Sequence, residues 1–350
     1  MSGSVKRHFS LGSDNHSGMS PEIFDYMKEA NCSHAVAYGD DEWTRKAKQA
    51  VQEFFDAEVD VYFTLTGTGA NLVGLGTLVS GYSGIFCTDV SHIHVDECAA
   101  PERFLSAKLI TIPHQEGKLT PESMETYLSY KGCEHHVQPE VISITQATEL
   151  GTLYQREELI RLREFKEQNG LFLYVDGARL SNALVSMNLS PAEFLALSGA
   201  DVISFGGTKN GLMLGEALVF SNHDSSARAK FLRKQCSQLA SKMRFLSAQF
   251  LGFLERGLWE RNARHSNQMA RVLAEGAAAI EGIKLAYPVE SNAVFVHLPP
   301  QANERLWEMG YFYHLWSADD QVVRWMTSFD TSEENIAAFV RDLRSVMNSL

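Results

Sequence analysis

Four short segments of the sequence carry side chains that could bind an anion or act as an acid, base or nucleophile. Each follows a short apolar run typical of a β-strand, and the segments are Thr66-Gly67-Thr68-Gly69-Ala70-Asn71, Ser91 to Glu97, Asp176-Gly177-Ala178-Arg179, and Gly206-Gly207-Thr208-Lys209-Asn210-Gly211. Ligands of open α/β sheets bind beyond the carboxyl ends of the strands. We therefore expect the four segments to contribute to one site.

The residue types in these segments suggest complementary roles. Small residues that open a helix after a strand present free backbone N–H groups to an anion. Lys209 lies among glycines, where backbone and ligand can approach closely, and partial burial would lower the pKa of its amine toward nucleophilic use. Asp176 ends an apolar run, and burying its charge would be costly without a cation, for which Arg179 is the neighbouring candidate.

Together these groups match the needs of one cofactor. Pyridoxal phosphate requires a lysine for its Schiff base, an anion site for its phosphate, a carboxylate at its ring nitrogen and a flat group against its ring. Lys209, the turn at Gly67, Asp176 and His92 supply all four. The turn lacks both the P-loop and the G-x-G-x-x-G patterns, so a nucleotide is not indicated. We expect no metal, because His92-x-His94 lacks H-E-x-x-H spacing and no second cluster appears.

The elements that must position these residues are visible in the pattern of apolar runs. Seven runs predict strands: Val61–Leu65, Gly84–Cys87, Lys108–Ile112, Val141–Thr145, Leu171–Val175, Val202–Phe205 and Ala217–Phe220. Helical patterns lie between them, at Gly69–Val79, Pro121–Tyr130 and Arg156–Gln168. Nearly continuous apolar strands are typical of parallel sheets covered on both faces. The sequence predicts an α/β fold built on a mostly parallel seven-stranded sheet.

After Phe220 the pattern changes to long helical stretches, and then to a short α/β tail. The predicted helices are Ser226–Lys242, Ser247–Arg256, His265–Glu281 and one that begins at Ser332, and the predicted strands are Ala293–His297 and Val322–Ser328. We expect a large cofactor-binding domain over residues 1–250, including the N-terminal segment, and a smaller C-terminal α/β domain over residues 251–350.

Composition excludes several classes of protein. The 350 residues are 45% hydrophobic and 21% charged, as in an ordinary folded chain, and the net charge of −12 disfavours a nucleic-acid partner. No run approaches the ~18 apolar residues of a membrane span, and no signal-peptide pattern is present. The five cysteines are widely spaced without a C-x-x-C pair. We expect a cytoplasmic protein without a membrane partner.

The same residues resemble the threonine aldolase family of fold type I pyridoxal phosphate enzymes. The matching segments are Ser13-Asp14-Asn15, Tyr38-Gly39-Asp40-Asp41, Thr66-Gly67-Thr68, His92 with Glu97, Asp176-Gly177-Ala178-Arg179, Gly207-Thr208-Lys209, Met243-Arg244 and Arg324. The amino-acid sequences of residues 146–152 and 205–211 are similar to those of bacterial low-specificity L-threonine aldolases, also known as phenylserine aldolases. The resemblance covers almost the whole chain.

The resemblance implies a role for each matching residue. Lys209 would hold pyridoxal phosphate, Asp176 would pair with the ring nitrogen and His92 would stack on the ring. Gly67, Thr68 and Arg244 would bind the phosphate, while Ser13, Arg179 and Arg324 would bind the substrate carboxylate. Tyr38 would reach in from a neighbouring subunit, which implies a homodimer or homotetramer with active sites at the subunit interface.

The implied reaction is cleavage of L-threonine, L-allo-threonine or a related 3-hydroxy-α-amino acid to glycine and an aldehyde. Many family members carry a histidine in an E-N-T-H segment, and here we align Thr148 with it. A threonine can contact the substrate's β-hydroxyl but is a poor base, so His92, Glu97 and a water are the candidate proton acceptors. Two alternatives remain: another fold type I reaction, such as β-elimination or serine hydroxymethyl transfer, or a non-catalytic protein that carries the cofactor.

Overall fold

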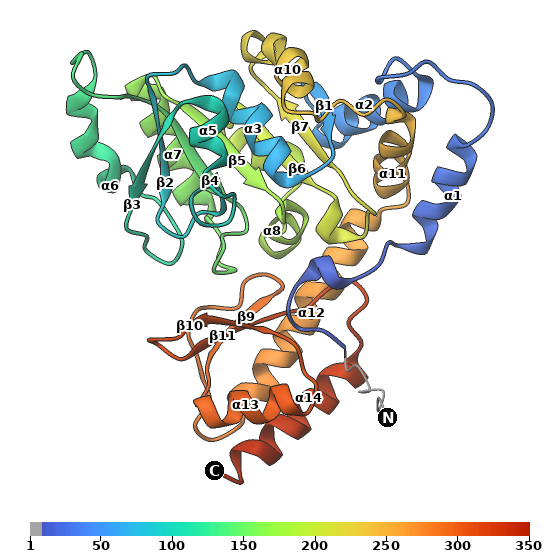
Figure 1. The fold of residues 1–350 in the computed structure, drawn as a ribbon, viewed down its shortest axis with the longest axis vertical. Coiled ribbons are helices and arrows are strands. Elements are labelled where there is room, and N and C mark those ends of the chain that lie inside the picture. Colours follow the sequence, from blue (N-terminus) through green and yellow to red (C-terminus); the bar gives the residue numbers. More distant parts are fainter. Residues whose placement is uncertain (1–8) are drawn as a thin grey trace.

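The computed structural model describes residues 9–350, which form two β-sheets surrounded by helices (Figure 1). The larger sheet has seven strands in the order β1-β7-β6-β5-β4-β2-β3. Their bounds are β1 Asp60–Thr64, β2 Ser83–Thr88, β3 Lys108–Ile112, β4 Gln138–Thr145, β5 Phe172–Gly177, β6 Val202–Gly206 and β7 Glu216–Phe220. Each strand overlaps one predicted run. Only β7 runs antiparallel to its neighbours, so the predicted mostly parallel sheet is confirmed.

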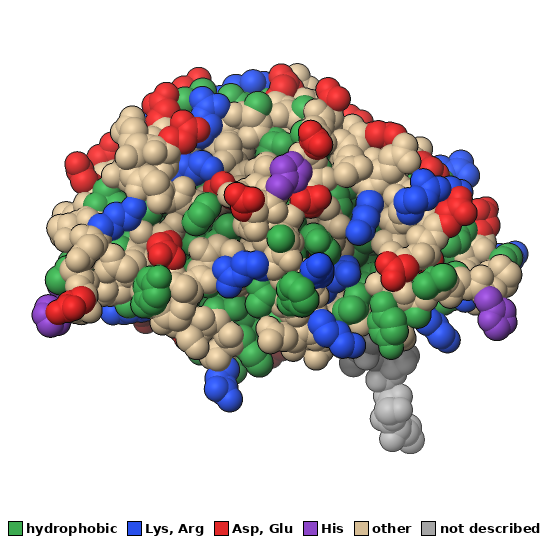
Figure 2. Space-filling view, turned by 90° about the horizontal axis from the view of Figure 1, so that it is seen from above, with side chains coloured by type: hydrophobic (Ala, Val, Ile, Leu, Met, Phe, Trp, Pro, Cys, Tyr) green, Lys and Arg blue, Asp and Glu red, His purple; other side chains and the backbone are tan. Residues whose placement is uncertain are grey.

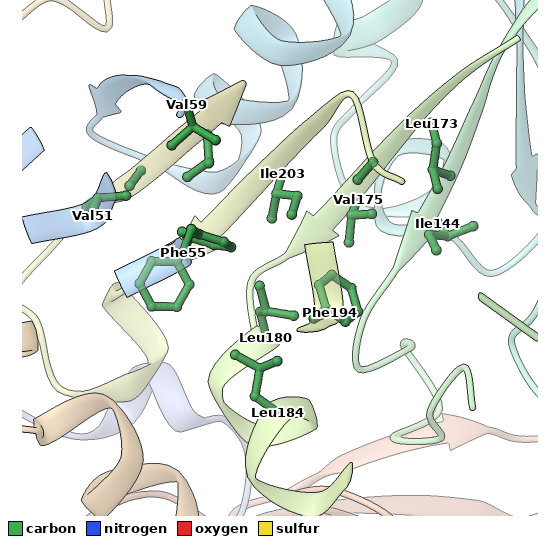
Figure 3. Close-up of a cluster of buried hydrophobic side chains, with 14 of the residues drawn as sticks. Val51, Phe55, Val59, Ile144, Leu173, Val175, Leu180, Leu184, Phe194 and Ile203 are labelled. Carbon is green, nitrogen blue, oxygen red and sulfur yellow. The ribbon is translucent and has the colours of Figure 1, made fainter. Parts of the chain in front are cut away.

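Side chains alternate between two helical layers along the strands. In β5, Leu173 and Val175 face one core, while Tyr174 between them faces the other. The first core packs against the helices α1 Pro21–Ala30, α2 Glu42–Phe55, α7 Arg156–Asn169, α8 Leu180–Met187, α9 Pro191–Ser198 and α11 Met243–Glu255. Part of it is drawn in Figure 3, where side chains from α2, α8 and α9 meet those of the central strands. Helices on both faces explain why the strands read as continuous apolar runs.

The second face of the large sheet is covered by α3 Gly67–Leu78, α5 Ala100–Leu105 and α10 His223–Gln235. Two further short helices, α4 His92–Val95 and α6 Pro121–Glu125, lie in the connections between strands of the large sheet. The 3-10 turns of the chain up to α10 are η1 Asp14–His16, η2 Thr126–Tyr130 and η3 Thr208–Asn210. The predicted helix Ser226–Lys242 is wrong at its C-terminal end, because α10 stops at Gln235. Ser237 there has a φ of 59°, which a continuing helix does not allow, and the side chain of Gln238 accepts a hydrogen bond from Leu65 N–H (2.9 Å).

The smaller sheet is antiparallel and has the order β10-β11-β9-β8. Its strands are β8 Lys284–Leu285, β9 Ala293–His297, β10 His314–Ser317 and β11 Val322–Met326, and they pack with α12 Leu258–Ala278, α13 Pro300–Glu308 and α14 Glu333–Met347. The N-terminal segment joins this second core, since Leu11 is buried in it and its carbonyl accepts a hydrogen bond from Met326 N–H (2.7 Å). The first described residues therefore lie on the smaller sheet.

Helix α12 connects the two sheets (Figure 1). Its first residue, Leu258, packs in the core of the large sheet, whereas Met269 to Ala277 pack in the core of the small one. The boundary that we predict at residue 250 falls inside α11, whose side chains belong to the large-sheet core. The division into two domains stays a prediction.

The surface carries both signs of charge. On the face shown in Figure 2, Lys and Arg side chains are interspersed with Asp and Glu side chains. No helix within residues 9–350 is both long and apolar enough to cross a bilayer.

Candidate active site

One cavity lies at the carboxyl ends of the central strands of the large sheet. Its lining comes from β4, β5 and the segments that follow β1, β2, β4, β5 and β6, and consists of Gly67, Asn71, His92, Thr145, Glu149, Asp176, Ala178, Arg179 and Lys209. The four segments singled out in the sequence thus meet in one place. Of the predicted site residues, the cavity brings together Gly67, His92, Asp176, Arg179 and Lys209.

Lys209 lies in η3, directly after β6. The end of β6 approaches the backbone of residue 178 so closely that a Cβ on Gly206 would lie 2.5 Å from the Ala178 carbonyl oxygen, so only glycine fits there. This contact brings Lys209 toward the end of β5. Burial, and then the neighbouring charge of Arg179, lower the pKa of the Lys209 amine. No hydrogen bond or ion pair joins that amine to any of residues 9–350. The amine is partly buried and has a raised neutral fraction, as a nucleophile requires.

The turn that carries Lys209 is held by a buried acid that our sequence analysis missed. Thr208 donates a hydrogen bond to Glu216 at the start of β7 (2.9 Å) and accepts one from Gly215 N–H (2.9 Å). Burial raises the pKa of Glu216 to about 7. Nothing in the sequence distinguishes this glutamate from a surface residue, since its burial depends on β7 lying between β1 and β6.

Asp176 is the last polar residue of β5 and is buried at the floor of the cavity. One carboxylate oxygen accepts a hydrogen bond from Ala178 N–H (3.0 Å), and the other accepts one from the Asn71 amide (3.1 Å). Arg179, the partner that we expected for it, instead binds Asp14 through two hydrogen bonds of 2.7 and 3.0 Å. That expectation was wrong because β5 ends in a turn, after which the Arg179 side chain extends toward the N-terminal segment. Asp176 therefore keeps a free face toward the cavity.

His92 begins α4 and belongs to a polar network behind the cavity. Its Nδ1 lies 2.8 Å from Glu97, whose side chain is fully buried, and the amide of Asn71 donates to the same Glu97 oxygen (2.6 Å). Tyr174 in turn donates to the Asn71 carbonyl oxygen (2.7 Å). The hydrogen bond with Glu97 raises the pKa of His92, against the effect of burial. Asn71 bridges the two carboxylates of Glu97 and Asp176, a role that its place in a glycine-rich turn did not reveal.

The anion site that we predict from the sequence would lie at the N-terminus of α3. Thr66 caps the helix by accepting a hydrogen bond from Gly69 N–H (3.1 Å), while the N–H groups of Gly67 and Thr68 have no acceptor within the helix. Open space surrounds the position of a Cβ at Gly67. Arg244, the third predicted phosphate ligand, does not line this cavity. It donates to the carbonyls of Cys32 and Ser33 and lines a separate hollow.

The predicted carboxylate site lies between the two sheets. Arg324 comes from β11 and donates to the Gly12 carbonyl (3.1 Å), while its guanidinium lies over the Trp316 ring (5.3 Å). Its Nε is buried without a hydrogen-bond partner. Burial, and then the charge of Arg179, lower the pKa of Arg324 to about 10. Ser13 caps η1 beside Asp14 and lines a neighbouring hollow instead of the cavity. An anion between the two arginines would relieve their mutual repulsion.

Asp14 completes this end of the site and was not among the predicted site residues. It is buried, and although burial alone would raise its pKa, the Arg179 guanidinium holds the pKa below its usual value. Asn292 also donates to it (3.1 Å). Ser13-Asp14-Asn15 was noted in the sequence, but Asp14 and Arg179 are 165 positions apart, so only the folded chain reveals the pair.

Tyr38 and Thr148 also lie outside the cavity lining of their own chain, as Ser13, Thr68, Arg244 and Arg324 do. Tyr38 is 49% exposed, and the Lys234 amine lies over its ring (5.2 Å). Thr148 is buried, and its hydroxyl is 2.6 Å from that of Thr152. The next residue, Glu149, enters the cavity instead. The roles of Tyr38 and Thr148 stay predictions.

These groups fit pyridoxal phosphate. The partly buried Lys209 amine has no hydrogen-bond or ion-pair partner among the described residues, Asp176 offers a carboxylate, His92 offers a flat ring, and the N-terminus of α3 offers N–H groups without an acceptor in the helix, all around one cavity. Within residues 9–350, no three His, Cys, Asp or Glu side chains are grouped so that they could hold a metal ion.

Sequence comparisons relate the chain to known proteins over most of its length. Residues 10–299 match the model of the beta-eliminating lyase family. The chain is 41% identical over 340 residues to the low specificity L-threonine aldolase of Pseudomonas aeruginosa, which covers 97% of this chain and 98% of that protein. It is 28% identical over 292 residues to the low specificity L-threonine aldolase of Saccharomyces cerevisiae, covering 82% and 73% of the two chains.

Solved structures share the fold. A threonine aldolase from Leishmania major superposes with a TM-score of 0.90 at 32% identity, covering 97% of this chain and 99% of the other. An aspartate aminotransferase from Rhodobacter sphaeroides superposes with a TM-score of 0.72 at 14% identity, covering 97% and 94%, and this likeness concerns the fold alone. The expected fold type I architecture is confirmed.

Proposed function

The chain belongs to the beta-eliminating lyase family and, within it, to the threonine aldolases, and from this premise we propose that it is a pyridoxal phosphate-dependent carbon–carbon lyase. Its substrates would be L-threonine, L-allo-threonine and related 3-hydroxy-α-amino acids, which it cleaves to glycine and an aldehyde. The observation that carries this proposal is the partly buried amine of Lys209, which has no hydrogen-bond or ion-pair partner among residues 9–350 and lies in one cavity with Asp176 and His92.

Each group around the cavity has a defined task toward the cofactor. When bound, pyridoxal phosphate supplies an electron-poor ring that accepts the electron pair of a bond broken at Cα. Lys209 would hold its aldehyde carbon, and Asp176 would keep the ring nitrogen protonated. His92 would cover a ring face, and the N–H groups of Gly67 and Thr68 would bind the phosphate.

Arg179 and Arg324 would bind the substrate carboxylate, with Ser13 as a further donor. Asp14 grips Arg179 with two hydrogen bonds and so fixes the plane of its guanidinium. Arg324 reaches the same region from the other sheet. Two arginines held by different sheets would orient the substrate about its carboxylate, and this orientation decides which bond at Cα is aligned for cleavage.

We place the complete active site at an interface between copies of this chain, in a homodimer or homotetramer. Tyr38 and Arg244 lie outside the cavity of their own chain, and both are near the exposed 33–37 segment. Mixing Lys209→Ala chains with Arg244→Ala chains tests this assembly, because a hybrid would contain one intact site. Recovered aldehyde release supports the proposal, whereas two inactive variants that remain inactive after subunit exchange contradict it.

We also propose a cytoplasmic location. All five cysteines are free, as expected of a chain kept in a reducing compartment.

The reaction is tested by incubating the holoenzyme with L-threonine and with L-serine and assaying acetaldehyde, glycine, pyruvate and formaldehyde. Acetaldehyde and glycine in equal amounts are expected from threonine. The family model is named for β-elimination, so that reaction is the second candidate. Elimination from serine yields pyruvate, and pyruvate without acetaldehyde would overturn the aldolase assignment. Formaldehyde from serine would indicate hydroxymethyl transfer, and a bound cofactor without any product would indicate a non-catalytic carrier.

A further inference from the structure

Cleavage between Cα and Cβ requires a group that takes the proton of the substrate's β-hydroxyl. Among the residues that line the cavity, four side chains could accept a proton: His92, Glu149, Asp176 and Lys209. Glu97, a candidate from the sequence, is fully buried behind His92 and is not part of the lining. The choice is therefore among these four.

Three of the four have other tasks or the wrong charge. The pKa of His92 is raised by Glu97, which favours its protonated form, and its Nδ1 is already engaged. Both oxygens of Asp176 accept hydrogen bonds, and this carboxylate is the one suited to the ring nitrogen. Lys209 is the group that would hold the cofactor.

Glu149 has no such task, yet its carboxyl group is held in place. His92 N–H donates to its Oε1 (2.9 Å), and the Thr145 hydroxyl donates to the same oxygen (2.7 Å). One donor belongs to the first residue of α4 and the other to the last residue of β4, so two elements fix the carboxyl group beside His92. A carboxyl group positioned in this way can exchange a proton with a substrate hydroxyl without reorganising its surroundings.

We propose that Glu149 is a catalytic residue that accepts the β-hydroxyl proton during cleavage and returns it to the aldehyde oxygen in the reverse reaction. This inference rests on the proposed aldolase function. The sequence analysis named His92, Glu97 and a water as candidate acceptors, and Glu149 was not among them.

The proton and electrons balance in this step. The O–H bond of the β-hydroxyl breaks, and its proton goes to the Glu149 carboxylate. The freed electron pair forms the C=O bond of the aldehyde while the Cα–Cβ bond breaks, and its electron pair remains on Cα. A proton added to Cα then gives glycine. Loss of the Glu149 proton to solvent restores the carboxylate, and no oxidant or reductant is consumed.

The surroundings of Glu149 increase its basicity. Burial is the main effect that raises its pKa, and the nearby Asp176 charge adds to it, while the hydrogen bonds from Thr145 and His92 N–H act in the opposite direction. The charge of Glu149 interacts with the cation of Arg179. In addition to burial, it also raises the pKa values of two neighbouring neutral groups, the Tyr154 hydroxyl and the Cys87 thiol. A carboxylate with a raised pKa binds the hydroxyl proton more strongly than an exposed one does.

Glu149→Gln is the direct test, because its side-chain carbonyl can still accept both hydrogen bonds but cannot accept a proton. We expect acetaldehyde release from L-threonine by the holoenzyme to fall at least about 100-fold. The variant should retain the visible absorption band of the bound cofactor. Its rate of glycine α-proton exchange in D₂O, a reaction that involves no β-hydroxyl, should stay within about threefold of the wild-type rate. Near-normal aldehyde release by Glu149→Gln would overturn the proposal and return the choice to the other three side chains of the lining.

Two other outcomes are also decisive. An equal loss of aldehyde release and glycine exchange would show a general role in binding or folding, and would overturn the specific role in the aldol step. A wild-type holoenzyme that releases no aldehyde from any 3-hydroxy amino acid would refute the proposed function itself, and the role of Glu149 with it. If the wild type releases aldehyde and Glu149→Gln releases it equally well, the role of Glu149 is refuted while the proposed function stands.

Glu290→Gln is the matched control. Glu290 also accepts a backbone hydrogen bond, from Leu153 N–H (2.7 Å), and one from the Gln155 side chain (3.1 Å), but it does not line the cavity. The same substitution there should leave aldehyde release within about threefold of wild type. A loss as large as that of Glu149→Gln would trace the effect to the stability of this region and overturn the proposal.

A spectroscopic readout does not depend on turnover. In pH-difference infrared spectra of the full-length holoenzyme, a protonated carboxyl band should titrate above the ordinary glutamate pKa of 4.5, and Glu149→Gln should lack it. Identical spectra for the two proteins would contradict a basic carboxylate at this position and would overturn the proposal.

Discussion

The two ends of the cavity are built in different ways. At the inner end, Asp176 lies at the end of β5, Lys209 and His92 come from the segments after β6 and β2, and hydrogen bonds within a single chain hold Asp176 and His92. At the outer end, Arg179 depends on Asp14 of the N-terminal segment, and Arg324 comes from the other sheet. The inner end is therefore set by the sheet, whereas the outer end depends on how distant parts of the chain meet. We expect mutations at the inner end to affect the cofactor and those at the outer end to affect the substrate.

The largest effect is expected for Lys209→Ala at the inner end. Lys209 is the only lysine among the described residues that line the cavity, so the visible band of the lysine-bound cofactor should vanish and aldehyde release should fall by at least about 10³-fold. Absorption spectra and circular dichroism would show a folded chain without that band. Persistence of the band would mean that another lysine holds the cofactor and that the inner end is wrongly assigned.

Arg179→Lys probes the outer end. The lysine keeps a cation beside Asp14 but loses the two-point geometry of the guanidinium. We expect KM for L-threonine to rise by roughly 10- to 100-fold, with cofactor affinity unchanged, since hydrogen bonds to charged groups contribute about 1.5–3 kcal/mol each. Steady-state kinetics and cofactor titration measure the two quantities. Equal losses in both would remove the distinction between the ends.

Asn71→Ala tests the support of the inner end. The substitution leaves the Tyr174 hydroxyl without its acceptor and the carboxylates of Glu97 and Asp176 without their bridge. Buried polar groups left unpaired cost about 1–3 kcal/mol, and the free energy of unfolding should fall by that amount in denaturant titrations. An unchanged midpoint would show that the network does not stabilise the fold.

The smallest expected effect is a pH dependence at His92. The pKa of His92 is raised from its ordinary value of 6.5 by the hydrogen bond with Glu97. The contribution of this pair to the free energy of unfolding is therefore fully present below pH 6.5, and it is lost as the pH rises through the pKa of the folded state. Glu97→Gln should therefore destabilise the chain more at pH 6 than at pH 9, as measured by denaturant unfolding. A larger loss at high pH would contradict the pair.

That His92, Asp176 and Lys209 lie together could be predicted from the sequence because they lie at or after the ends of strands of one sheet. Strand positions depend on local apolar runs, and the residue after a run is then placed by the sheet. Partners distant in the sequence were not predictable in this way. Arg179 appeared to belong with Asp176, three positions away, but it binds Asp14 instead.

Glu149 was missed for a different reason. The alignment placed Thr148 at the substrate, but the hydroxyl of Thr148 faces Thr152 and the adjacent carboxylate enters the cavity. A shift of one residue in the alignment of a loop changes which side chain is expected to face the site. Loops lack the regular periodicity of helices and strands, so the sequence does not reveal which of two neighbouring side chains does so. The end of α10 was misplaced similarly, because the turn at Ser237 depends on the contact between Gln238 and Leu65.

The N-terminal segment also joins the two sheets through its hydrogen bonds. Residues 11 to 14 are tied to the smaller sheet through Met326, Arg324 and Asn292, while Asp14 holds Arg179 on the larger one. Any rotation of one sheet relative to the other must pull on this tether and so displace the guanidinium. A closure that rotated one sheet relative to the other would thus also move, through residues 11 to 14, the guanidinium that we propose binds the substrate carboxylate.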